Sequence, residues 1–359
     1  MKVAILGTQG VPARYGGFET LVENIIGNNA SPDVEYTVFC SCKDLKTDYK
    51  VYKGAQLRYI PFNANGKQSV LYDILSLMKS MWGYDVILVL GVSGGIFFPV
   101  FRLFCRKKLI INVDGLEWKR PKWGRFARLF LRLSEELALR FSDIVVADNQ
   151  GIVDYISKRY KKDSLLIAYG SDHVKREMPE DRHQEILEAF HLEQKTYFLS
   201  ICRIEPENNC ELILDVFAHT GKRLVFIGNW ERCEFGHALK EEYSRYKNIS
   251  IIDSIYDLDV LFVLRQNCKT YIHGHSAGGT NPSLIEAMFC ECTILAYDVI
   301  YNRETTENKA HYFRDGIDLA LLTSGDGEVA DNAKKMYEIA ERRYTWATIA
   351  RQYEMFYGC

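Results

Sequence analysis

Residues 1–20 read MKVAILGTQGVPARYGGFET, and this stretch sets the expected fold. The apolar run at 3–6 is typical of a strand that is buried on both faces. It leads into a glycine-rich loop, and a helical pattern follows from Phe18. A strand, a loop and a helix in succession are the beginning of a βαβ unit, so the chain is expected to form a parallel sheet.

The glycine-rich loop is a candidate phosphate or sugar site. Gly16 and Gly17 would bring the backbone N–H groups of the helix start close to a ligand, and Arg14 could pair with a diphosphate. A plain glycine turn would explain the same residues. Because Gly7 and Gly10 are three apart, the loop is not the Gly-x-Gly-x-x-Gly of nicotinamide-cofactor proteins.

The alternation of short apolar runs and helical patterns continues along the chain. It predicts two series of strands, at 3–6, 36–40, 57–60, 86–90, 109–113, 144–147 and 165–167, and at 197–202, 223–227, 249–252, 270–272 and 293–297. Two series indicate two doubly wound α/β domains, with a charged hinge segment at 170–194 between them.

Composition excludes several classes of protein. With 359 residues, 47% hydrophobic and 26% charged, the chain is typical of a globular protein of two domains. A net charge of -2 argues against a general nucleic-acid binder, and neither a signal peptide nor a transmembrane helix is expected. The ten cysteines form no Cys-x-x-Cys pair, so reduced thiols and no metal site are expected.

A second glycine-rich segment lies at 278–288, with the sequence GGTNPSLIEAM. Pro282 suits the first turn of a helix, whose free N–H groups attract an anion. Glu286 could accept hydrogen bonds from sugar hydroxyls. A segment that binds a phosphate and a polyol side by side is suited to a sugar nucleotide. The candidate donor-binding residues here are Gly278, Gly279, Thr280 and Asn281. An ordinary capped helix is the alternative.

Two further candidates follow predicted strands, where ligands of open α/β sheets gather. Asp114 could orient a sugar hydroxyl, or could simply start a turn. Arg203 could hold phosphate oxygens, or could be a surface arginine.

The segment 102–132 is basic and aromatic, with ten Lys and Arg and two acids. Such a helix face can lie on anionic lipid, which predicts a protein held at the inner face of the cell membrane. A solvated face is the alternative, and no RNA-binding signature accompanies the patch.

Together these segments resemble the glycosyltransferases of the GT-B fold, retaining family 4, in the bacterial group that resembles rhamnosyltransferases. The matching motifs are PARYGGFET at 12–20, VDGLEWKR at 113–120, PENN at 206–209 and the segment 273–286. The resemblance implies a N-terminal acceptor-binding domain at 1–170, a nucleotide-sugar domain at 171–343 and a closing helix at 344–359 that packs back on the first domain.

The resemblance also implies roles for single residues. Glu286 would bind the nucleotide ribose, whereas the first glutamate of the family's pair is replaced by Gly278. Arg203 matches a diphosphate-binding arginine, and Asn208 stands where a lysine is common. Asp114 takes the place of a histidine that is often catalytic. Asp114, Arg203 and Glu286 are therefore the expected catalytic residues, without a metal or cofactor.

The expected activity is transfer of L-rhamnose from dTDP-L-rhamnose, with retention, to a lipid-linked saccharide in capsule or exopolysaccharide assembly. A UDP-hexose donor is the first alternative. A sugar-nucleotide-binding protein without transfer activity is the second, because Gly278 and Asn208 replace expected groups. A nucleotide-sugar epimerase would share the architecture.

Overall fold

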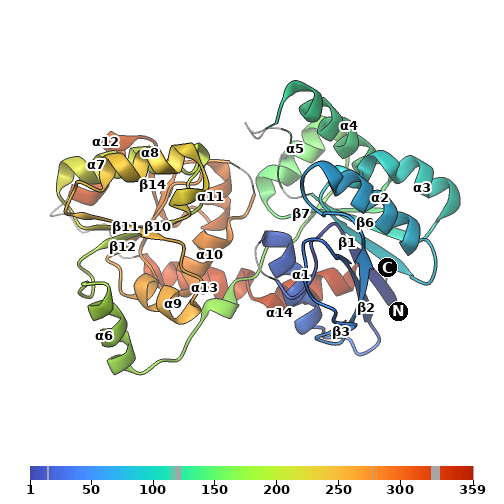
Figure 1. The fold of residues 1–359 in the computed structure, drawn as a ribbon, viewed down its shortest axis with the longest axis horizontal. Coiled ribbons are helices and arrows are strands. Elements are labelled where there is room, and N and C mark those ends of the chain that lie inside the picture. The colour runs from blue at the N-terminus through green and yellow to red at the C-terminus, as the bar shows by residue number, and fades with distance from the viewer. Residues whose placement is uncertain are drawn as a thin grey trace. The chain divides into compact units, whose positions relative to one another are not determined.

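The computed structural model describes residues 1–13, 16–113, 115, 118, 123–277, 279–324 and 332–358, with only the backbone of 67 and 324. The chain divides into two compact units (Figure 1). One unit comprises Met1–Gly170 with Trp346–Cys359, and the other comprises Ser171–Thr345.

The first unit is built on an eight-stranded sheet in the order β3-β4-β2-β1-β5-β6-β7-β8. Neighbouring strands are parallel, apart from the antiparallel pair β3 and β4. Its elements are β1 (Lys2–Leu6), α1 (Gly17–Gly27), β2 (Glu35–Ser41), β3 (Val51–Tyr52), β4 (Ala55–Ile60), η1 (Gly66–Gln68), α2 (Ser69–Ser80), β5 (Val86–Leu90), η2 (Ser93–Phe97), α3 (Phe98–Phe104), β6 (Lys108–Val113), α4 (Arg125–Phe141), β7 (Ile144–Ala147), α5 (Gln150–Tyr160), β8 (Leu165–Leu166) and α14 (Trp346–Met355).

The second unit is built on a six-stranded parallel sheet in the order β11-β10-β9-β12-β13-β14. Its elements are η4 (Asp172–Val174), α6 (Glu180–Ala189), β9 (Phe198–Ile201), η5 (Pro206–Asn208), α7 (Cys210–Thr220), β10 (Leu224–Gly228), η6 (Trp230–Arg232), α8 (Glu234–Tyr243), β11 (Ile249–Asp253), α9 (Leu258–Gln266), β12 (Thr270–His273), α10 (Pro282–Phe289), β13 (Ile294–Tyr297), α11 (Ile300–Thr305), β14 (His311–Phe313), α12 (Gly316–Ser324) and α13 (Ala333–Arg343).

The expected α/β class with two doubly wound sheets is confirmed, and each sheet is flanked by helices (Figure 1). The central strands are buried on both faces, as the whole of β5 illustrates. The structure adds two features that the sequence pattern did not predict. The segment 170–194, expected to be a hinge, carries η4 and α6, and α6 packs its His183 ring against Phe262 of the second unit. The short strands β3 and β14 were not expected.

The helix α14 completes the first unit. Trp346, Ile349 and Tyr353 are each 2% exposed or less, and full burial of such side chains contributes roughly 1.5–3 kcal/mol apiece. Asn112 Nδ2, on β6, donates to the Tyr353 hydroxyl at 2.5 Å. The apolar stripe of the last helix is therefore covered by the first sheet and its neighbours.

Candidate functional site

The strand order places the candidate site of the second unit. The chain leaves β9 toward β10 on one side, and β12 lies on the other side of β9. In open α/β sheets this reversal of strand order opens a crevice at the carboxyl ends of the two strands. Arg203 follows the end of β9, and the segment from Gly274 to Asn281 follows β12.

The start of α10 is fixed firmly to the end of β9. Asn281 caps the helix, because its Oδ1 accepts from Ser283 N at 3.0 Å. Ser283 Oγ donates to Ile201 O at 3.0 Å and lies 2.8 Å from the Tyr271 hydroxyl. The free N–H groups of this helix start are therefore held beside the strand that leads to Arg203, in a geometry suited to an anion.

Glu286 lies one turn into α10 and forms a buried ion pair that the sequence did not predict. Arg265, on α9, is 1% exposed and donates through Nη2 to Glu286 Oε2. The side chain of Glu286 is 20% exposed, so the carboxylate remains accessible. Burial acts to lower the pKa of Arg265, but Glu286 raises it above its ordinary value. Arg265 Nε and Nη1 have no hydrogen-bond partner in the described structure.

Asn208 is buried and connects the loop after β9 to the loop after β12. It is 3% exposed; its Nδ2 donates to Arg203 O at 2.7 Å, and its Oδ1 lies 2.6 Å from His275 Nδ1. Because Oδ1 can only accept, His275 must carry its proton on Nδ1. Asn208 therefore fixes the backbone at Arg203 instead of presenting its amide to a ligand.

Arg203 keeps its guanidinium available to a ligand. Its side chain is 40% exposed, and its ion pair with Glu205 spans 4.0 Å from Nη1 to Oε2. Gly274 allows the loops to approach, since a Cβ there would lie 2.2 Å from Asn208 O. The site thus combines a loosely held cation with a closely packed backbone.

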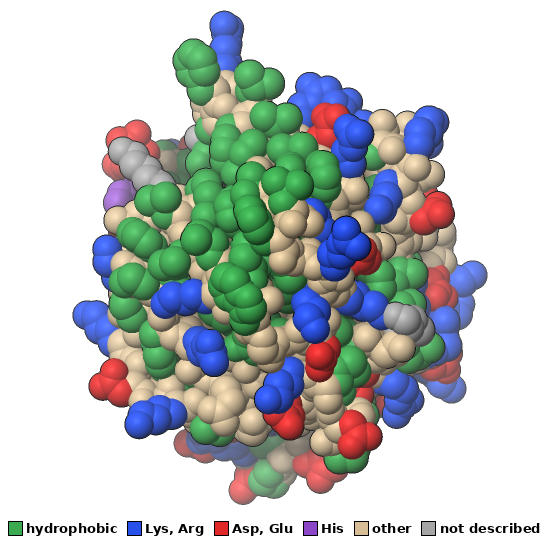
Figure 2. Space-filling model, turned by 90° about the vertical axis from the view of Figure 1, so that its right-hand side faces the viewer, with side chains coloured by type: hydrophobic (Ala, Val, Ile, Leu, Met, Phe, Trp, Pro, Cys, Tyr) green, Lys and Arg blue, Asp and Glu red, His purple; other side chains and the backbone are tan. Residues whose placement is uncertain are grey.

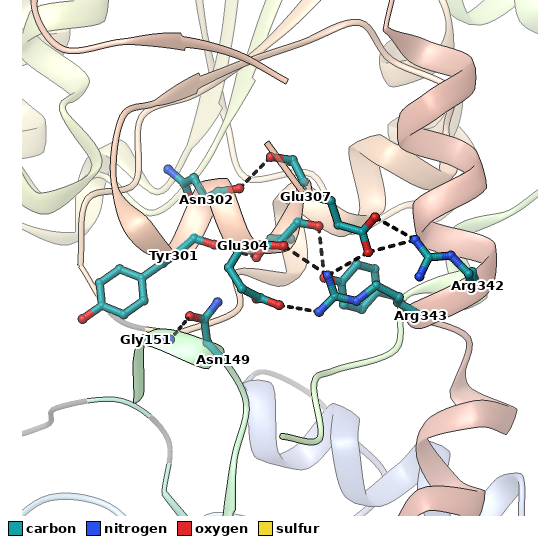
Figure 3. A network of polar contacts seen from close by, with 11 residues as sticks. Asn149, Gly151, Tyr301, Asn302, Glu304, Glu307, Arg342 and Arg343 are labelled. Atoms are coloured by element: carbon teal, nitrogen blue, oxygen red, sulfur yellow. Dashed lines mark hydrogen bonds and ion pairs between the residues drawn. The ribbon is translucent and has the colours of Figure 1, made fainter. Parts of the chain in front are cut away.

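A polar network joins α11, the turn after it and α13 (Figure 3). Asn302 of α11 donates through Nδ2 to His275 O at 2.9 Å. Two arginines at the end of α13 hold α11 and the turn after it: Arg342 Nη2 donates to Glu307 Oε2 at 2.7 Å, and Arg343 pairs with Glu304. The position of His275 therefore depends on packing between α11 and α13.

In the first unit, the glycine-rich loop is held by carboxylates of α1. Glu19 Oε1 accepts from the Thr8 hydroxyl at 2.9 Å and from Gln9 N at 2.8 Å. Gly16 precedes the helix with φ 129°, and a Cβ there would lie 2.0 Å from Glu19 Oε2. Gly16 is therefore required by conformation and by space, whereas a Cβ at Gly17 would make only an ordinary contact with the Tyr169 ring at 4.0 Å.

Glu23 secures the middle of the same loop. It accepts from Ala13 N at 2.5 Å and from the Tyr52 hydroxyl at 2.7 Å, and Lys53 Nζ lies 3.1 Å from Oε1. Burial acts to raise the pKa of Glu23, but these hydrogen bonds lower it below its ordinary value.

The site residues that the sequence predicts fall into two groups, one in each unit. Arg203, Asn208, Gly279, Thr280, Asn281 and Glu286 lie around the carboxyl ends of β9 and β12, and Gly16 and Gly17 lie at the start of α1. Arg14, Asp114 and Gly278 are outside the described residues. The ring centre of Trp118 lies 5.5 Å from the guanidinium carbon of Arg132 on α4.

Glu135, a buried glutamate of α4, ties this helix to α5. Tyr155 and Tyr160 donate to its Oε1 at 2.8 and 2.7 Å. Burial raises the pKa of Glu135 above its ordinary value.

Neither a metal cluster nor a membrane-spanning helix is found in the part of the chain that the structure describes. No group of three His, Cys, Asp or Glu side chains there could hold a metal ion. No described helix combines the length and apolar character needed to cross a bilayer.

Comparison with protein families gives two matches. Residues 1–172 match a family described as a domain of unknown function, DUF1972, and residues 181–343 match the family described as glycosyl transferases group 1. No curated protein matches the chain.

Solved structures share the fold over the whole chain. A sucrose-phosphate synthase from Thermosynechococcus elongatus aligns with TM-score 0.82 and 15% identity, over 99% of this chain and 98% of the other. HepE from Anabaena, solved with UDP-glucose, aligns with TM-score 0.77 and 15% identity over 100% of both chains. A glycosyltransferase from Rickettsia africae aligns with TM-score 0.73 and 12% identity, over 99% and 97%. These likenesses establish that the two sheets follow the GT-B arrangement of strands.

Proposed function

We propose that this chain, which has the GT-B fold and whose residues 181–343 match the group 1 glycosyl transferases, transfers a sugar with retention from a nucleoside diphosphate donor held by its second unit. The observation that carries the proposal is the grouping of Glu286, Arg203 and the capped start of α10 around one pair of strand ends. A carboxylate and a cation suited to phosphate, placed at neighbouring strand ends, are the complement of a sugar nucleotide.

Each group has a distinct role in the proposed reaction. Glu286, oriented by Arg265, accepts hydrogen bonds from the ribose hydroxyls. Arg203 and the N–H groups at the start of α10 stabilise the negative charge that develops on the diphosphate as the glycosidic bond to it breaks. In the first unit, Asp114 orients donor or acceptor hydroxyls, and Arg14 with the Gly16–Gly17 backbone assists the phosphates. Asn208, Gly278, Gly279 and Thr280 border the donor.

We propose L-rhamnose from dTDP-L-rhamnose as the sugar and its donor. The support is the resemblance of this chain to rhamnosyltransferase-like enzymes, including asparagine at 208 and glycine at 278. The buried position of Asn208 supports a site that works without a lysine there, because the amide already has a structural use.

A UDP-hexose is the second candidate donor. Its support is the likeness to HepE, whose structures include complexes with UDP and with UDP-glucose. The two candidates differ in base and sugar, so the donor can be identified by binding alone.

The proposed acceptor is a lipid-linked saccharide of capsule or exopolysaccharide assembly, reached at the inner face of the cell membrane. The basic segment 102–132 supports peripheral contact with anionic lipid. The first unit would bind this acceptor.

The first experiment measures thermal stabilisation by dTDP-, UDP- and GDP-sugars. A donor at about 100 times its dissociation constant adds roughly 2.7 kcal/mol of stability. A shift confined to dTDP-L-rhamnose supports the rhamnosyl donor, and a preference for a UDP-sugar replaces it. Glu286→Gln should lose the shift. A donor that binds but is never transferred to any lipid-linked acceptor would favour a non-catalytic binding protein.

A further inference from the structure

A large apolar surface covers one face of the first unit. Figure 2 shows hydrophobic side chains gathered over the side of the molecule that carries α2 and α3. Nine of the 18 large hydrophobic side chains that are exposed in the described part of the chain belong to α2, α3, α4 and the turn after α2. These nine form what we call the apolar face: Leu71, Met78, Trp82, Val100, Leu103, Phe104, Phe126, Leu129 and Leu133.

The helices of the apolar face expose apolar side chains in addition to those that they bury in the core. The helix α3 already buries Phe98 and Phe101, yet its opposite side exposes Leu103 by 79% and Phe104 by 75%. A helix that is apolar all round belongs in a core or a membrane. Soluble monomers rarely expose large contiguous apolar patches, and those that exist mark interaction sites.

The helix α4 presents an amphipathic surface of the same kind. Phe126, Leu129 and Leu133 recur at helical spacing, and Phe126 is 91% exposed. Arg125 and Arg128 are exposed beside them, and the exposed cations of α4 outnumber its one exposed acid, Glu136. Among the described residues from α2 to α4, the exposed cations are Lys79, Arg106, Lys107, Arg125, Arg128, Arg132 and Arg140, and the exposed acids are Asp85 and Glu136.

We propose that the apolar face inserts into the surface of a membrane rich in anionic phospholipid, with its cations against the headgroups. The inference rests on the proposed membrane-linked acceptor and names the residues that make contact. Apolar side chains reach the boundary between headgroups and acyl chains, while arginines beside them pair with phosphates. Trp82, 75% exposed, is the residue type that favours this boundary.

Charge decides between a lipid surface and a second copy of the chain. In a symmetric dimer the same patch meets itself, so its cations would face one another and repel. An anionic bilayer offers the opposite charge to these seven cations, which outnumber the two exposed acids, and an apolar interior to the apolar face. Of the two candidates, only the anionic bilayer is complementary both to the apolar face and to its cations.

The test is sedimentation of the full chain with vesicles of phosphatidylcholine alone or mixed with phosphatidylglycerol. We expect binding only to the mixed vesicles. Phe104→Ser with Phe126→Ser should lower the partition coefficient about tenfold or more, because both rings leave the bilayer. Arg125→Glu with Arg128→Glu should lower it about 20-fold or more, at about fivefold for each cation lost. The phenylalanine variant should keep mainly the electrostatic part of the binding, which salt screens. High salt should therefore weaken vesicle binding by this variant more than vesicle binding by the wild type.

A matched control uses exposed apolar residues of the other unit. Ile317→Ser with Leu321→Ser, on α12, removes side chains that are 73% and 65% exposed and should leave vesicle binding unchanged. Equal binding by the wild type and the phenylalanine variant would overturn the inference. So would a dimer that forms without vesicles and dissociates in that variant.

The donor assay separates this inference from the proposed function. A phenylalanine variant that leaves vesicles but keeps its thermal shift with the sugar nucleotide supports the inference. Vesicle binding without any donor binding would count against the proposed function alone.

Discussion

At the scale of single residues, Arg265 orients the main carboxylate of the candidate site, Glu286. It supplies a buried positive charge to Glu286, while two of its nitrogens have no partner in the described structure. A lone arginine in the apolar helix 258–266 is the signal that could have indicated it from the sequence. Its carboxylate partner was found because Glu286 lies within a recognisable motif, whereas Arg265 lies outside all of the motifs.

Arg265→Met should destabilise the protein strongly. Removing one partner of a buried ion pair costs about 3–5 kcal/mol, and a value near the lower end is expected because the Glu286 carboxylate that remains is 20% exposed. Urea unfolding measures the loss. The double variant Arg265→Met with Glu286→Gln should recover part of it, and strictly additive losses in the two single variants would contradict the pairing.

Asn208→Lys should not improve the site, although it restores the residue that the family resemblance suggests. The lysine would break hydrogen bonds to Arg203 O and His275 and place a charge at a position that is 3% exposed. We expect a loss of about 2 kcal/mol or more in the free energy of unfolding. A variant of unchanged stability with tighter donor binding would show that position 208 is a phosphate site.

At the scale of elements, α2 and η2 share a buried carboxyl group with an unusual titration. Asp73, on α2, is 3% exposed and accepts a hydrogen bond from Ser93 of η2. Burial raises the pKa of Asp73 from an ordinary value of 3.8 to about 7. The folded chain therefore holds this proton more tightly than the unfolded chain does.

The sign of the effect on stability follows directly. Between about pH 4 and about pH 7 the folded state binds more protons at Asp73, so this carboxyl lowers stability progressively as pH rises and adds no further change above about pH 7. The full effect is on the order of 4 kcal/mol. Asp73→Asn should remove it, so the variant should gain on the wild type across that interval in urea unfolding. A difference that does not change with pH would show that Asp73 titrates normally.

The elements themselves were largely predictable. Buried strands such as β5 are uninterrupted apolar runs, and α10 begins with the residues that start helices. The strands β3 and β14 are too short to leave a pattern, and the helix α6 lies in charged sequence that resembles a linker. The places of Arg203 after β9 and of the start of α10 after β12 followed from the sequence pattern, whereas their roles toward a ligand stay predictions. Asn208 is buried through its contact with His275, which lies 67 residues further along the chain, so no local pattern could predict this contact.

At the scale of the whole molecule, the two sheets make two separate cores. Each unit has its own set of strands, which makes unfolding in more than one step the expectation. Calorimetry should show two transitions. A sugar nucleotide should raise the one that belongs to Ser171–Thr345, because its proposed ligands Arg203 and Glu286 lie there.

A matched variant assigns the transitions. Trp346→Ala opens a cavity in the first unit. It should lower the free energy of unfolding of that unit by about 3–5 kcal/mol, and so lower the midpoint temperature of that transition only. A single transition that moves as a whole with the nucleotide and with Trp346→Ala would mean that the units unfold together.

The return of α14 to the first unit has a consequence for synthesis on the ribosome. The second unit is an insertion, so the first unit contains segments made before it and a segment made after it. The nascent N-terminal part must wait, with the surface that Trp346, Ile349 and Tyr353 will cover still open to water, until residues 346–357 emerge. The later-encoded unit can thus be the first to finish folding. During that interval the N-terminal part is the natural client for a chaperone.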